Sequence, residues 1–270
     1  MTEGFLPVVL SPIVTTRLEK TAADNGFDLE LPPVGDWLAF ASSQTPLHIW
    51  LTALNAPKPG GYLAGLSRRD VLHALSDHGT DYSAPIPGTA AGIRRVDDIP
   101  GLHSLLRRAF QLARTLPDEL LHDFDKATAR MPQATEAERL SIQRVGQDIF
   151  RRGLLEYWDG HCALTGLAIP ELLRAGHIKP WADCPSDAER LDVFNGLLLA
   201  PQLDAAFDGG FMTIACDGSV VVSDALSDDA RALLGLNQPL RIRDLRPQHE
   251  RYLTWHRARV FKKTYGLPPP

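Results

Sequence analysis

A histidine, an asparagine and two aspartates follow one another in the second half of this 270-residue sequence. His177 stands in "AGHIKPW", Asn195 opens "NGLLLA", and Asp204 and Asp208 lie one helical turn apart in "PQLDAAFD". A neutral imidazole accepts a proton from water near pH 7, because its ordinary pKa is about 6.5. Carboxylates are ligands that Mg²⁺ and Mn²⁺ prefer. These groups would suit phosphodiester hydrolysis, in which an attacking water loses a proton and a cation neutralises charge on the phosphate.

The elements that must position these residues are short. Apolar runs alternating with turn signals predict a strand that ends at His177 and another that follows Asn195. Pro201 favours the start of a helix, since proline is well tolerated in the first turn, and this helix carries Asp204 and Asp208 on one face. The Asn195 amide can hydrogen-bond and thereby fix the loop or the imidazole.

A longer helix is expected to precede this segment, beginning after Thr135 and closing at Trp158. One polar face of this helix and two later basic residues are candidates for contacts to nucleic-acid phosphates: Arg144, Gln147, Arg151, Lys179 and Arg190. The alternative is a solvated helix face whose charges pair along the helix, because Asp148 is at pairing distance from Arg151 and Arg152.

The combined segments "HCALTG", "LLRAGHIKPWADC" and "RLDVFNGLLLAPQLDAAFDGGFMTI" resemble the HNH endonuclease family, in the branch with an HIKPW…NGLLL…LDxxFD core. The resemblance covers roughly residues 136–225. It implies a ββα-metal finger, two strands and a helix around one divalent cation, acting on DNA. It also implies that His177 is the general base, that Asn195 is the middle residue of the motif, and that Asp204 ligates the metal. Asp208, one turn further on the same helix face, is expected to add an oxygen ligand for Mg²⁺ or Mn²⁺.

The sequence departs from the family pattern at two positions. Gly176 stands where many HNH enzymes have a second metal ligand, and Asp204 replaces the last histidine of the motif. One ligand fewer favours an alternative reading, a non-cleaving nucleic-acid-binding or regulatory module that retains the fold. If the glycine only leaves a ligand out, Gly176→Asp is expected to tighten metal binding.

The cysteines indicate neither a disulfide framework nor a zinc site. Cys162, Cys184 and Cys216 form no CxxC pair, and structural zinc needs four ligands in a closed geometry, so structural zinc is not expected. A reducing, cytoplasmic setting fits this cysteine usage. No apolar run approaches the roughly 18 residues of a membrane span, so no membrane association is expected.

The fold class expected for the whole chain is α+β. An N-terminal mixed α/β domain (1–100) would be followed by a helical connector (101–134) and a C-terminal ββα-metal HNH nuclease domain (135–270). Strands are expected at 37–41, 47–54 and 62–66, with a turn at 57–61. The C-terminal half should meet a polyanion first, because eight Lys or Arg stand against two acidic residues between 241 and 263.

The sequence also suggests how such an enzyme would be used. A nuclease unit that contacts mainly phosphates reads little sequence, so the N-terminal domain is expected to select the target in a restriction or defence enzyme. Paired arginines, Arg68-Arg69 and Arg94-Arg95, are its expected DNA contacts. Cutting both strands usually requires two active sites, which a homodimer would supply.

Overall fold

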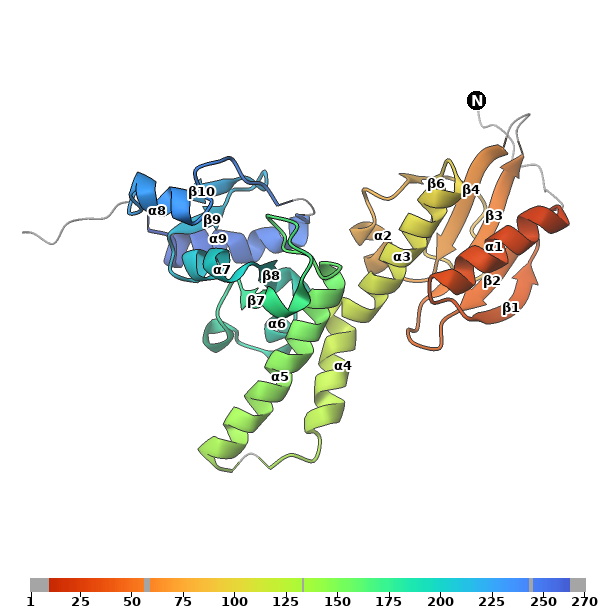
Figure 1. Ribbon diagram of the computed structural model, residues 1–270. Helices are drawn as coiled ribbons and strands as arrows, with labels where there is room; N and C mark the ends of the chain where they lie inside the picture. Colours follow the sequence, from red (N-terminus) through yellow and green to blue (C-terminus); the bar gives the residue numbers. More distant parts are fainter. Residues whose placement is uncertain (1–9, 56–58, 133, 243–244, 263–270) are drawn as a thin grey trace, which may run out of the picture. The chain divides into compact units, whose positions relative to one another are not determined.

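The computed structural model describes residues 10–55, 59–132, 134–242 and 245–262. The chain divides into two compact units, Met1–Arg114 and Thr115–Pro270 (Figure 1). The expected connector 101–134 is divided between these units. Part of the expected turn at 57–61 and part of the basic run 241–263 lie outside the described residues. In the described residues no helix is both long and apolar enough to cross a membrane.

The first unit is built on a six-stranded antiparallel sheet with the order β1-β2-β3-β4-β6-β5. Its strands are β1 (Leu29–Val34), β2 (Trp37–Ala41), β3 (His48–Asn55), β4 (Pro59–Leu66), β5 (Thr80–Asp81) and β6 (Gly92–Val96). Its helices are α1 (Pro12–Asp24), α2 (Arg69–Ala74) and α3 (Ile99–Thr115). Helix α1 packs on β2 and β3, and Asn25, directly after α1, hydrogen-bonds His103 of α3. The three strands expected from the sequence are therefore present as β2, β3 and β4.

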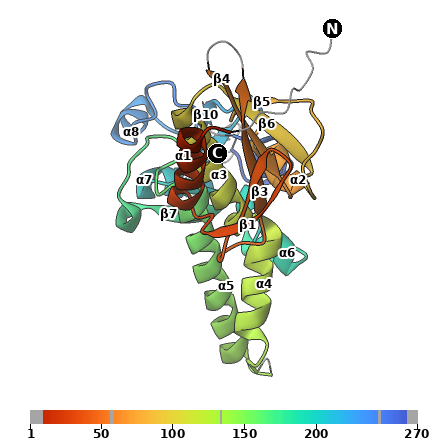
Figure 2. The same ribbon diagram turned by 90° about the vertical axis from the view of Figure 1, so that its right-hand side faces the viewer.

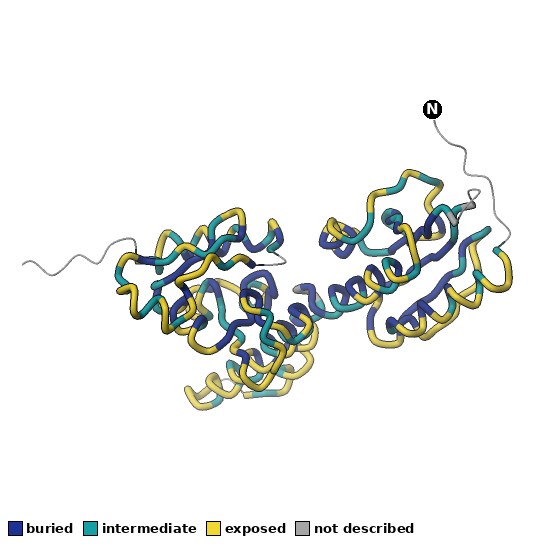
Figure 3. The backbone as a smooth tube through the Cα atoms, turned by 45° about the horizontal axis from the view of Figure 1, so that its top comes forward, coloured by how far each residue is buried: buried dark blue, intermediate teal, exposed yellow. Residues whose placement is uncertain are grey.

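The inner strands of this sheet are buried, whereas the edge strand β1 is exposed along its length (Figure 3). Leu51 and Leu63 are fully buried, and Trp50 packs in a cluster with Trp37 and Ile93. Apolar residues of β2 and β3 face this interior because β-branched and aromatic side chains pack well on a pleated surface. The first unit therefore has a core of its own.

The paired arginines of the first unit are bound to the protein itself. Arg94 is buried, donates to the Leu72 carbonyl and pairs with Asp81. Arg68 pairs with Asp70 and donates to the Ala113 carbonyl, and Arg95 donates to the Gly60 carbonyl. Three of the four arginines expected to contact DNA thus hold the fold of the first unit together. Arg94 is buried and so is not available to DNA, whereas DNA contact by Arg68 and Arg95 stays a prediction.

The second unit begins with a helical hairpin of α4 (Pro117–Thr128) and α5 (Glu136–Tyr157), which Figure 2 shows as two adjacent helices. Thr135 and Glu138 form a capping box at the start of α5, which satisfies two backbone groups reciprocally. The helices approach closely because Gly153 has no side chain: a Cβ there would lie 2.5 Å from Leu120 Cδ1. The expected helix from Thr135 to Trp158 is confirmed.

The elements after α5 supply two strands followed by a helix. Strands β7 (Arg174–His177) and β8 (Gly196–Leu199) pair antiparallel with His177 opposite Gly196, and α7 (Pro201–Asp208) follows. The loop from β7 to β8 contains η2 (Trp181–Asp183), α6 (Asp187–Arg190) and η3 (Val193–Asn195), and η1 (Pro170–Leu172) precedes β7. The remaining elements are β9 (Met212–Ile214), β10 (Val220–Val222), α8 (Asp228–Leu233), η4 (Pro247–His249) and α9 (Glu250–Arg259).

Candidate active site

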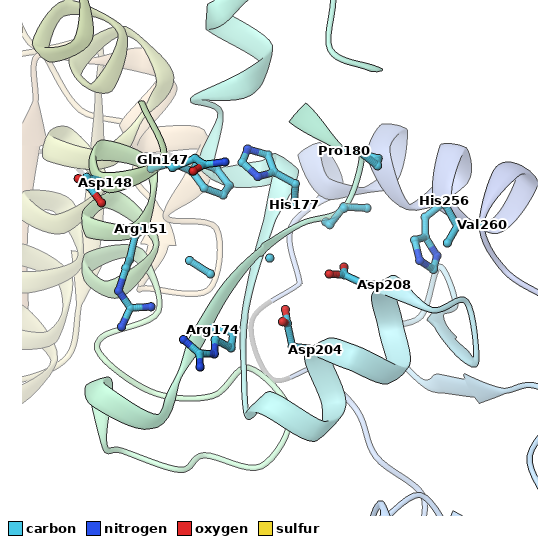
Figure 4. A pocket seen from close by; sticks show the side chains of 14 residues that line it. Gln147, Asp148, Arg151, Arg174, His177, Pro180, Asp204, Asp208, His256 and Val260 are labelled. Atoms are coloured by element: carbon cyan, nitrogen blue, oxygen red, sulfur yellow. The ribbon is translucent and has the colours of Figure 1, made fainter. Parts of the chain in front are cut away.

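A pocket of about 600 Å³ opens on the second unit where α5, β7, α7 and α9 meet (Figure 4). Three carboxylates, two arginines and two histidines are among its lining residues: Asp148, Asp204, Asp208, Arg151, Arg174, His177 and His256. Three of the four residues singled out first from the sequence therefore meet in one cavity.

His177 ends β7, and its ring is held from two sides. Its Nε2 lies 2.8 Å from the Arg190 carbonyl oxygen, and its ring stacks on Phe150 with 3.8 Å between centroids. A carbonyl only accepts hydrogen bonds, so Nε2 carries the proton and Nδ1 keeps the lone pair. Nδ1 has no hydrogen-bond partner in the described residues. Burial lowers the pKa of His177 to about 4, although the bond to Arg190 opposes this, so the ring is a neutral base at pH 7.

Asp204 and Asp208 converge beside Gly176 (Figure 4). A Cβ on Gly176 would lie 2.4 Å from Asp204 Oδ1 and 4.0 Å from Asp208 Oδ1. Burial raises the pKa of Asp204 to about 6, repulsion from Asp208 adds to this, and Arg174 opposes it. Burial also raises the pKa of Asp208. The absence of a side chain at residue 176 therefore leaves room for an acidic pair.

This acidic pair fits a divalent cation. Asp204 Oδ1 is buried and has no hydrogen-bond partner among the described residues, which is costly for a carboxylate unless a cation or a proton compensates it. Both groups offer hard oxygen ligands one turn apart on α7. No cluster of three or more His, Cys, Asp or Glu that could hold a metal occurs in the described part of the chain, so solvent would have to complete the coordination.

Asn195 lies behind the pocket and is not among its lining residues. It is fully buried, and its Oδ1 accepts a hydrogen bond from the Lys179 backbone N–H at 2.8 Å. Its Nδ2 donates to the Lys179 and Glu189 carbonyls, each at 3.2 Å, and to Cys184 Sγ. The side chain thus closes the loop that carries the Arg190 carbonyl, a contact to structure and not to a reacting group.

Residues 162–215, which include β7, β8 and α7, match the model of a family described as HNH endonuclease. The second unit carries an HNH endonuclease domain. No curated protein matches the chain significantly. The match identifies the family of this segment and does not extend into the first unit.

Three of the side chains expected to contact DNA form hydrogen bonds or ion pairs within the HNH domain itself. Lys179 pairs with Glu189 at 3.1 Å, and Arg190 donates to the Trp181 and Cys184 carbonyls and to Asp187. Arg151 lines the pocket, but its guanidinium donates to the Leu173 and Pro170 carbonyls. These three side chains hold the loops around β7 in place, and their contact with DNA stays a prediction.

The other two residues expected to contact DNA, Arg144 and Gln147, are exposed on α5. They make no side-chain hydrogen bond to a described residue, and Gln147 also lines the pocket. The alternative of charges paired along the helix is wrong for Asp148, because Arg152 pairs instead with Asp123 of α4 at 2.6 Å.

Arg174 is a pocket residue that the sequence reading missed. It is exposed, it lies near enough to Asp204 to lower that residue's pKa, and it makes no hydrogen bond or ion pair with a described residue. Strand alternation was the available signal, because residues two apart in β7 share a side and Arg174 stands two before Gly176.

Gly176→Ala should lower the affinity of the HNH domain for Mn²⁺ about tenfold, as shifts of groups that orient ligands often do. The new Cβ would lie 2.4 Å from Asp204 Oδ1 and must displace that carboxylate. For the same reason the expectation that Gly176→Asp tightens metal binding is withdrawn. Isothermal titration with Mn²⁺ measures the change, and Ala137→Ser, at an exposed position near the start of α5 that does not line the pocket, is the control. Equal affinities in wild type and Gly176→Ala would refute the steric argument.

His256 of α9 is a second buried histidine beside the pocket, which the sequence reading also missed. Its ring stacks on Phe207, its Nε2 donates to the Phe207 carbonyl at 3.1 Å, and its Nδ1 accepts from the Thr213 hydroxyl at 2.9 Å. Burial lowers its pKa from 6.5 to about 4. The folded state therefore excludes a proton that the unfolded chain binds between these pH values.

His256→Gln should flatten the dependence of stability on pH. In the wild type the free energy of unfolding is expected to fall as pH drops from 6.5 towards 4, because only the unfolded state gains the His256 proton there. Urea unfolding at a series of pH values gives the slope for each protein. Above pH 6.5 the difference between the two proteins should be constant, and identical slopes below it would contradict a neutral, buried His256.

Proposed function

We propose that the HNH domain is a metal-dependent DNA endonuclease with His177 as its general base. The orientation of the His177 imidazole supports this proposal most directly. Its Nε2 is hydrogen-bonded to the Arg190 carbonyl, its Nδ1 keeps a lone pair, and the ring shares a pocket with the Asp204–Asp208 pair. A neutral, oriented base beside a cation site is what phosphodiester hydrolysis requires.

In the proposed reaction the Nδ1 atom of His177 takes a proton from the attacking water as its oxygen forms a bond to phosphorus. The bond from phosphorus to the leaving oxygen breaks, and that oxygen takes a proton from solvent. The Arg190 carbonyl stabilises the imidazolium that forms, because it accepts a hydrogen bond from Nε2–H throughout. Asp204 and Asp208 would hold Mg²⁺ or Mn²⁺, which when bound would supply charge neutralisation on the phosphate and leaving group.

Plasmid cleavage tests this proposal directly. Supercoiled DNA should become nicked or linear with Mg²⁺ or Mn²⁺ and remain intact with EDTA, and an RNA substrate in the same panel tests the class of nucleic acid. Linear product formed without accumulation of the nicked circle would favour a homodimer with two sites. The second candidate, a non-cleaving nucleic-acid-binding module, is favoured because the described residues bring two carboxylates together and add no third ligand to them. It predicts DNA binding with no cleavage in any metal.

Arg174→Ala should raise KM for DNA about tenfold or more and change kcat less. Arg174 is the pocket arginine whose donors are not taken by described residues, and a charge-assisted bond to a phosphate contributes about 1.5–3 kcal/mol. The slope of log affinity against log salt should fall by about one. Arg139→Ala removes one exposed charge from α5 and is the matched control. Equal effects of both variants would mean that Arg174 acts only through net charge.

We further propose that the first unit selects the DNA target, by sequence or by base modification, in an enzyme of restriction or defence type. The first unit is large enough to have its own core, so it can fold as a separate recognition domain. A nuclease domain that contacts mainly phosphates reads few bases, so selection of a target requires another part of the protein. Removal of residues 1–114 should keep cleavage and lose discrimination among substrates. A cut at residue 101 would divide helix α3 and would confuse misfolding with lost recognition. Unchanged discrimination after removal would exclude this role.

A further inference from the structure

Helix α9 lies outside the segment that matches the family and yet touches both sides of the pocket. The match ends at residue 215, whereas α9 runs from Glu250 to Arg259. Its His256 lines the pocket together with Val260, directly after the helix. A part of the chain outside the family match therefore contributes residues to the pocket.

The first turn of α9 binds the loop behind His177. Tyr252 is buried, and its hydroxyl donates to Asp192 Oδ2 at 2.8 Å. Arg251 pairs with the same carboxylate oxygen and also lies over the Tyr252 ring. Asp192 is 1% exposed, and its Oδ1 accepts from the Phe194 backbone N–H at 2.9 Å. A buried carboxylate thus joins α9 to η3.

The carbonyl that orients His177 lies between the two anchors of this loop. Asn195 binds the Glu189 carbonyl, α9 binds Asp192, and the Arg190 carbonyl between them accepts a hydrogen bond from His177 Nε2–H. With residues on both sides held, the Arg190 carbonyl has one position relative to the imidazole. Loss of either anchor frees the segment on that side.

The second half of α9 binds the helix that carries the acidic pair. His256 donates to the Phe207 carbonyl in the last turn of α7, next to Asp208, and stacks on the Phe207 ring. One rigid helix therefore contacts the loop behind the base and the helix of the carboxylates. The distance between these two parts is set by the length of α9 from Tyr252 to His256.

We propose that α9 is a brace of the active site, in which Tyr252 and Asp192 are positioning residues that hold the Arg190 carbonyl against His177. The brace fixes the imidazole in the tautomer with the proton on Nε2 and the lone pair on Nδ1. The inference rests on the proposed function only in giving His177 the role of base; the tautomer itself is a property of the folded protein.

Tyr252→Phe and Asp192→Asn test this role in the full-length protein. Each should lower kcat about three- to tenfold with little change in KM. The reason is that each variant removes a hydrogen bond that orients the base and removes no contact to DNA. ¹⁵N NMR of labelled histidine should show a smaller Nε2–H fraction at His177 in both variants, assigned with His177→Ala. The double variant should be little worse than either single one, since both act through the same contact.

Two controls on α9 separate positioning from stability. Leu253→Val trims the buried neighbour of Tyr252 and leaves the hydrogen bonds intact, and Arg259→Ala changes an exposed residue of the same helix. The brace would be overturned if Tyr252→Phe kept the wild-type kcat and the wild-type His177 tautomer. It would also be overturned if Leu253→Val, at the same thermal stability as Tyr252→Phe, lost as much kcat. Absence of all cleavage in the wild type would refute the proposed function alone, because the NMR measurement decides the brace without DNA.

Discussion

Replacing His177 by alanine should lower the rate of plasmid cleavage by about 10²–10⁴-fold and leave DNA affinity nearly unchanged. The ring is a neutral base with its proton fixed on Nε2, and no other described histidine of the pocket has a free ring nitrogen, since both nitrogens of His256 are bonded. Nicking rates under single-turnover conditions and DNA binding by fluorescence anisotropy measure the two quantities separately.

The control for this variant is chemical rescue. His177→Ala leaves a space against Phe150, where the imidazole ring had stacked, so imidazole added to the buffer should restore part of the rate. Circular dichroism and thermal unfolding establish that the variant is folded. A folded variant that nicks DNA at the wild-type rate would mean that His177 is not the base, and the proposal would then have to be abandoned.

Asp204→Asn should abolish cleavage and yet make the metal-free protein more stable. In the folded protein the pKa of Asp204 is about 6 because of burial and of Asp208, so at neutral pH ionisation of Asp204 opposes folding. A neutral amide of the same shape removes this cost, which is about 1–2 kcal/mol after allowance for solvent screening of a half-buried group. The same change removes a ligand, so Mn²⁺ binding should weaken.

Urea unfolding with EDTA and titration with Mn²⁺ give the two effects independently. Asp208→Asn should act in the same directions and less strongly, and Asp148→Asn, an exposed carboxylate of the same pocket, should change neither quantity. A destabilised Asp204→Asn protein with unchanged metal affinity would place the cation elsewhere and reduce Asp204 to a structural residue.

Local sequence signals predicted the elements of the HNH domain well. Thr135 marked the start of α5, Pro201 marked the start of α7, and the apolar run after Asn195 became β8. Each signal depends on neighbours a few residues away, such as a capping hydroxyl or the fixed φ of proline, and is therefore readable from one sequence.

Roles set by distant partners could not be read in this way. Lys179 and Arg190 looked like free cations, but a folded loop gives them Glu189, Asp187 and backbone carbonyls as partners. Gly176 looked like a missing ligand, whereas it is the space that Asp204 occupies. Both corrections come from tertiary contacts, which sequence spacing does not specify.

The three carboxylates of the pocket favour binding of a cation before DNA. Asp148, Asp204 and Asp208 supply three carboxylates against the two guanidinium groups of Arg151 and Arg174, so in the proposed reaction a DNA phosphate would meet less repulsion once a divalent cation had bound. Cation and DNA would then be thermodynamically coupled ligands, each raising the affinity of the protein for the other by the same factor. On the proposed function, scarcity of divalent cations would therefore weaken DNA binding at the pocket as well as cleavage.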